Sequence, residues 1–90
     1  MYITTHAKVR ALERLFDMHL EGQNDEEKLY SDQKSASKIG EFLKKLIKPS
    51  MGFNLEGAKY QAKIDGFDKY RAVIQVKNKQ HHLITIVPIY

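Results

Sequence analysis

A histidine and two arginines near the start of the chain have a spacing that suits acid–base chemistry on a phosphate. His6, Arg10 and Arg14 are each four residues apart, so in a helix they form a row about two turns long. His6 would lie near the helix N-terminus, where anions are favoured. Metal-free RNA cleavage uses such groups: one takes the 2′-hydroxyl proton, another gives a proton to the 5′-oxygen, and cations stabilise the phosphorane. The alternative is a solvated helix face whose arginines pair with Glu13 and Asp17.

A second polar set occupies alternating positions in the last third of the chain. Apolar residues at 60, 62 and 64 and at 70, 72 and 74 alternate with residues that are polar except for Val73, which is the period of strands with one buried face. The other face of these strands then carries Lys59, Gln61, Lys63, Arg71, Gln75 and Lys77. A basic, uncovered sheet face can meet phosphates. We therefore predict RNA contacts at Arg14, Lys59, Lys63, Gln75 and Lys77, the alternative being the ordinary wet face of an antiparallel sheet.

Motifs for metals and nucleotide cofactors are missing from the sequence. The histidines at positions 6, 19, 81 and 82 have no His-Glu-x-x-His or comparable spacing, and the five glycines form neither a GxGxxG nor a Walker pattern. Without cysteine, Cys-ligated zinc and iron–sulfur centres are excluded. We expect neither a metal nor another cofactor, and we interpret His81-His82 as a polar hairpin tip.

Two amphipathic segments must position the histidine row. From Thr5 to Glu21, apolar residues recur every three or four positions, with Gly22 as a natural stop. A second helical stripe runs from Ser35 or Ser37 to Lys48 and ends at Pro49. Between them, Asn24 followed by three acidic residues resembles a cap and first turn, so a short helix could start there.

After Pro49 the period changes to that of strands. Asp65-Gly66 is a turn signal between two alternating segments, and residues 78–81 supply the next turn. The stretch Leu83–Ile89 is so continuously apolar that we expect a strand buried on both faces, at the centre of the sheet. The predicted fold is α+β: two N-terminal helices packed on a three-stranded antiparallel β-sheet, in a single domain covering residues 1–90.

Length and composition limit the classes of function. Ninety residues suffice for one small core. The net charge of +4 is concentrated in residues 35–90, which hold ten basic and four acidic side chains, and it favours polyanionic partners. The lack of cysteine, of an apolar run of about 20 residues and of a signal-peptide pattern predicts a cytoplasmic protein with no membrane association.

The row, the hairpin and the last strand together resemble a known family. His6-Ala7-x-x-Arg10-x-x-Glu13-Arg14, then the hairpin with Tyr70–Ile74 and the terminal Leu83–Val87, resembles the small endoribonucleases of the barnase, colicin and RelE-toxin superfamily. Residues 22–48 insert an acidic segment and a second helix into that pattern. The resemblance implies an endoribonuclease of toxin or phage type that cuts RNA through a 2′,3′-cyclic phosphate. It makes His6 the acid or base, Arg10 and Arg71 phosphate ligands, and Thr85 a hydroxyl that lines the site, with an antitoxin or the ribosome as possible partners.

Two other classes of function fit the same sequence. One is a non-catalytic module that binds RNA or DNA through the same cations. The other is a small phage or bacterial protein that binds and inhibits a host protein, through the acidic stretch at 24–32 or through an edge strand.

Overall fold

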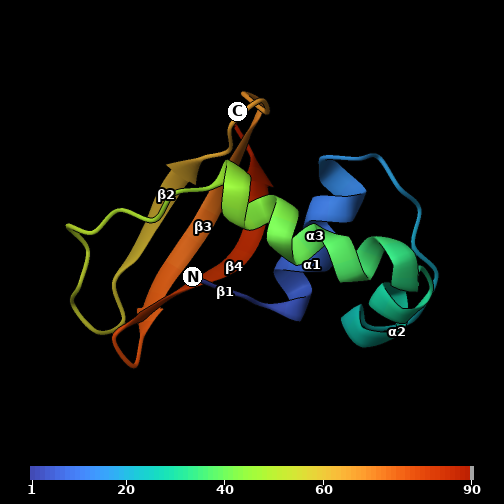
Figure 1. Ribbon diagram of the computed structural model, residues 1–90, viewed down its shortest axis with the longest axis horizontal. Coiled ribbons are helices and arrows are strands. Elements are labelled where there is room, and N and C mark those ends of the chain that lie inside the picture. The colour runs from blue at the N-terminus through green and yellow to red at the C-terminus, as the bar shows by residue number, and fades with distance from the viewer. Residues whose placement is uncertain (90) are drawn as a thin grey trace.

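The computed structural model describes residues 1–89, which form a four-stranded mixed sheet and three helices. The element order is β1 (Tyr2–Ile3), α1 (Thr5–Arg14), α2 (Asp25–Tyr30), α3 (Gln33–Leu46), β2 (Lys59–Lys63), β3 (Tyr70–Lys77) and β4 (Gln80–Pro88). Figure 1 shows the helices beside the sheet, with α1 next to β4. The α+β class is thus confirmed, whereas the prediction of two helices and three antiparallel strands is wrong in detail.

The sheet has the order β1-β4-β3-β2. The strands β2, β3 and β4 form the predicted antiparallel meander, and β1 adds a parallel neighbour through Tyr2 opposite His82 and Ile3 opposite Leu83. Sequence patterning missed β1 because two residues cannot show alternation. The turn between β3 and β4 has positive φ at both Asn78 and Lys79, as a two-residue hairpin with right-handed twist requires.

The last strand has one buried face rather than two. Leu83 and Ile86 are fully buried, whereas Thr85 and Val87 are only half-buried. The prediction that this strand is buried on both faces is therefore wrong. An irregularity at Val73/Ile74 in the pairing with β3 puts Leu83 and Ile86, three residues apart, on the same buried face, because a bulge of this kind gives one strand an extra residue.

The first helix is shorter than its apolar pattern. It ends at Arg14, and Asp17 adopts a left-handed backbone with φ 54° while the Met18 N–H bonds to Leu12 O. The later apolar residues still reach the core from an irregular segment: Leu20 is buried, and Phe16 contacts the rings of Phe42 and Phe67. The spacing of Phe16 and Leu20 thus reflects their packing into the core, which an irregular segment achieves here without a helix.

The two later helices have polar caps of their own. The side chain of Asn24 accepts from the Glu27 N–H at the start of α2, so the short helix predicted there is present. Asp32 caps α3 in the same way through the Ser35 N–H. The second amphipathic helix therefore begins a few residues before Ser35 and ends at Leu46, two residues before the predicted end.

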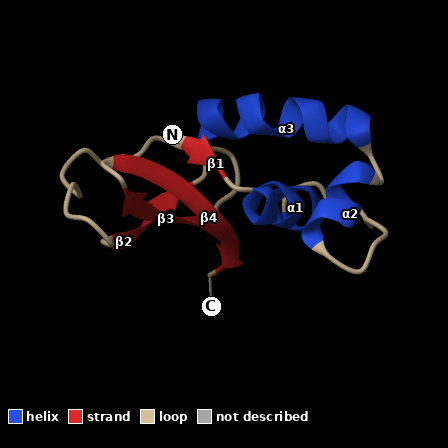
Figure 2. Ribbon diagram, turned by 90° about the horizontal axis from the view of Figure 1, so that it is seen from below, coloured by secondary structure: helices blue, strands red, loops and turns tan. Residues whose placement is uncertain are grey.

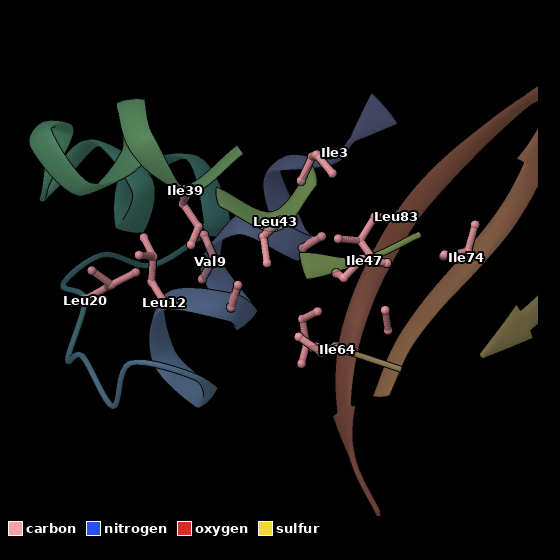
Figure 3. Close-up of a cluster of buried hydrophobic side chains, with 14 of the residues drawn as sticks. Ile3, Val9, Leu12, Leu20, Ile39, Leu43, Ile47, Ile64, Ile74 and Leu83 are labelled. Atoms are coloured by element: carbon pink, nitrogen blue, oxygen red, sulfur yellow. The ribbon is translucent and has the colours of Figure 1, made fainter. Parts of the chain in front are cut away.

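The core lies where the end of α3, the inner side of α1 and one face of the sheet meet. Leu43 and Ile47 approach Leu83 and Ile64, and on the helical side Leu12 lies near Ile39 (Figure 3). In Figure 2, α3 crosses above α1 while α1 lies beside β4. The sheet thus has an inner face toward α3 and an outer face turned away from it.

The loop after α3 is attached to the inner face through Tyr60. The Tyr60 hydroxyl accepts from the Ser50 N–H and lies 2.7 Å from His81 Nδ1, and the Phe53 ring stacks on Tyr60 with centroids 4.6 Å apart. Burial raises the pKa of Tyr60 above its ordinary value of 10.0, and the Ser50 N–H partly offsets this. His81 is therefore part of a polar contact under the loop rather than a free hairpin tip.

Thr4 joins the start of α1 to β4. Its hydroxyl accepts from the Ala7 N–H at 3.1 Å and donates to Leu83 O at 2.8 Å, and its own N–H also donates to Leu83 O. We expect Thr4→Ala to lower the free energy of unfolding by about 1–2 kcal/mol, the usual cost of losing an N-cap. Urea unfolding measures this change. Thr4→Ser should retain most of the stability, and a Thr4→Ala protein as stable as wild type would contradict the assigned role.

Candidate nucleic-acid interface and acid–base pair

The site region combines the outer side of α1 with the outer face of the sheet. Leu12 packs toward α3, so the row at His6, Arg10 and Arg14 lies on the other side of α1. The outer sheet face is likewise turned away from α3. The residues that alternate with it along β3 and β4, such as Ile74 and Leu83, point into the core. Both surfaces therefore face away from α3, but His6 contacts α2, which lies across α1 from the sheet (Figure 2).

His6 pairs with an acidic residue that the sequence patterns did not connect to it. His6 Nδ1 lies 2.7 Å from Asp25 Oδ2, and the two side chains are 39% and 35% exposed. A carboxylate only accepts hydrogen bonds, so Nδ1 carries a proton, and Nε2 is then the acceptor whenever the ring is neutral. Asp25 thus fixes the tautomer in which Nε2 is available as a base. Its place in an acidic first turn of α2 gave no sign of this contact across 19 residues.

Arg10 is the arginine of the row that is nearest to His6. Its guanidinium donates to Glu13 at 2.7 Å, and Glu13 also lies 3.4 Å from Lys28 Nζ. Two cations thus share one carboxylate, so the group carries a net positive charge. The pairing of an arginine with Glu13, which belongs to the alternative of a solvated helix face, occurs here and holds Arg10 in place, while Asp25 adds a negative charge beside His6.

Arg14 has a different environment from His6, although both belong to the same row. It donates to Ile86 O on β4. Eight residues of helix turn a side chain by about 80° and move it about 12 Å along the axis. His6 therefore projects toward α2, whereas Arg14 projects toward the sheet.

Thr85 and Arg71 lie on the outer sheet face near Arg14. Thr85 precedes Ile86, and Arg71 pairs in register with Val87, the residue that follows it. The Arg71 guanidinium donates to Tyr70 O at 3.0 Å, so it folds along its own strand. The four predicted catalytic residues thus form two groups: His6 and Arg10 near α2, and Thr85 and Arg71 at the end of β4 that Arg14 contacts.

The remaining predicted RNA contacts share the outer face. Register aligns Lys59 with Gln75, and Lys63 with Arg71, across β2 and β3. Lys59, Lys63 and Lys77 are exposed, whereas Gln75 is half-buried and donates to Gly57 O at 3.3 Å. Within residues 1–89, none of Lys59, Lys63, Arg71 and Lys77 forms an ion pair. No acidic residue occupies the outer-face positions of β2, β3 and β4, so this surface is uniformly basic or neutral.

Comparisons with protein-family models, with curated proteins and with solved structures find no match to this chain. Among the described residues there is no cluster of three or more potential metal ligands. No helix within residues 1–89 is long and apolar enough to cross a membrane. The geometry of the acid–base pair and of the basic face is therefore the basis of the function proposed below.

Proposed function

We propose that the protein is a metal-independent endoribonuclease that binds RNA along the basic outer face and cleaves it beside His6. The observation that carries this proposal is the His6–Asp25 pair, which presents an oriented imidazole one helix turn from a fixed arginine. A base oriented by a carboxylate is the arrangement that makes an imidazole effective in proton transfer. The resemblance of residues 6–14 to small endoribonucleases agrees with this assignment.

The proposed reaction needs only groups of the RNA, the protein and water. His6 Nε2 takes the proton of the 2′-hydroxyl, and the 2′-oxygen forms a bond to phosphorus. The bond between phosphorus and the 5′-oxygen breaks, and water gives a proton to the departing 5′-oxygen. Arg10 stabilises the charge that develops on the phosphoryl oxygens. The products are a 2′,3′-cyclic phosphate and a free 5′-hydroxyl.

Thr85, Arg71 and the lysines have a binding role in this proposal. His6 points toward α2 and Arg71 lies on the sheet, so both do not act on one phosphate. The phosphates of neighbouring nucleotides would contact Arg14, Arg71 and Lys63, which guide the strand from the sheet to the cleavage point.

The experiment that tests the reaction uses single-stranded RNA in the presence of a chelator. We expect cleavage that leaves 2′,3′-cyclic phosphate ends, and no cleavage of the same sequence made with 2′-deoxynucleotides, because the nucleophile is then absent. Loss of cleavage on adding the chelator, or cutting of the deoxy strand, would rule out this mechanism.

A second candidate is a nucleic-acid-binding module without catalysis, again with RNA as the partner. It is favoured by the unpaired cations on the sheet, which lie apart from His6. In that case RNA binds with a strong salt dependence but stays intact. The same incubation separates the two, since only the enzyme shortens the RNA.

A further inference from the structure

An exposed tyrosine on β1 has no part in the core or in the cleavage chemistry. Tyr2 is 56% exposed and stands opposite His82 in register, with ring centroids 5.1 Å apart and planes at 54°. Their neighbours Ile3 and Leu83 are buried in the core. Because successive side chains alternate across a strand, Tyr2 and His82 belong to the outer face.

The ring pair ends a row of polar side chains that crosses the sheet. His82 aligns with Gln75 on β3, and Gln75 aligns with Lys59 on β2. Lys77 lies two residues further along β3, on the same face. An aromatic ring on a face that also carries lysines is the combination that binds single-stranded nucleic acids, in which cations contact the backbone and rings stack on bases.

His82 contacts the tyrosine ring through its own ring and not through a hydrogen bond. Its Nε2 is buried and forms no hydrogen bond within the described part of the chain. The Tyr2 ring packs against the imidazole in a tilted arrangement, and more than half of the tyrosine remains open to solvent.

We propose that Tyr2 is a stacking platform for an unpaired base, which makes single-stranded RNA the substrate class. This inference rests on the proposed function, because it places the stacked base on the same outer face as the phosphate contacts. A base within a duplex is covered on both sides by its neighbours and offers no free ring face. Double-stranded RNA should therefore bind this end of the sheet more weakly.

The test measures the binding of short, fluorescently labelled 2′-deoxy single strands, which are not cut. One strand carries adenine bases and the other is an abasic backbone with the same charge. We compare wild type with Tyr2→Leu, with Tyr2→Phe, which keeps the ring, and with Tyr30→Leu, which removes an exposed tyrosine from α2. Stacking on one aromatic ring corresponds to about 5- to 150-fold in affinity.

We expect Tyr2→Leu to weaken binding of the adenine strand by that factor while the abasic strand binds as it does to wild type. Tyr2→Phe and Tyr30→Leu should bind the adenine strand like wild type. An unchanged affinity in Tyr2→Leu, or an equal loss for both strands, overturns the stacking platform and leaves the proposed function standing. A wild-type protein that binds neither strand overturns both.

Discussion

Replacing His6 with alanine should reduce the rate of RNA cleavage by about 10²–10⁴-fold, the usual contribution of a positioned general base. The loss follows because His6 is the described side chain that contacts Asp25 and lies one helix turn from Arg10. Cleavage of an end-labelled RNA, followed on a gel under single-turnover conditions, measures this change. Folding should persist, since the partly exposed His6–Asp25 pair contributes only about 0–1 kcal/mol.

Two further variants separate a chemical role from a structural one. Asp25→Asn keeps the shape of the side chain but removes the carboxylate that fixes the His6 tautomer, so it should lower the rate by less than His6→Ala does. His19→Ala removes an exposed histidine outside the site and should leave the rate unchanged. Equal cleavage by wild type and His6→Ala would end the enzyme assignment.

Reversing two charges on the outer face of the sheet should strongly reduce the affinity for RNA. The double variant Lys63→Glu with Arg71→Glu changes two cross-strand neighbours into carboxylates at one end of the basic face, where β2 ends and β3 begins. We expect a strong loss of affinity for single-stranded RNA, and a salt dependence whose slope falls by about 0.7 for each phosphate contact removed. Fluorescence anisotropy at several salt concentrations measures both quantities.

The matched control places the same charge change on another surface. Lys34→Glu with Lys38→Glu alters two exposed lysines of α3, which lies on the opposite side of the molecule from the outer face. It should weaken binding far less than the variant on the sheet. Similar losses in both double variants would show that net charge, and not the outer face, governs binding.

Local patterns were sufficient for the parts of the fold that depend on neighbours in sequence. Alternation placed Tyr60 and Ile74 on the buried face and Lys63 and Arg71 on the other, and the register confirms that arrangement. The turn at Gly66 follows from equally local chemistry. The parallel strand at Tyr2–Ile3 was missed because its pairing with β4 has no local signal.

The candidate site was harder to predict because its contacts join distant segments. A spacing of four residues made His6, Arg10 and Arg14 look equivalent. Each step of four residues turns the side chain by about 40° around the helix, so His6 contacts Asp25 whereas Arg14 contacts Ile86. Neither partner can be identified from residues 5–14. The same limit applies to Tyr2 and His82, which meet only when the sheet is complete.

The bonds that fix both ends of α1 to β4 also constrain the order of folding. Thr4 reaches a carbonyl 79 residues away and Arg14 one 72 residues away. Contacts between such distant residues are costly in chain entropy and form late. During synthesis α1 leaves the ribosome long before β4 does, so it has no strand on which to dock. The histidine row and the basic face should therefore come together only in the last cooperative step of folding.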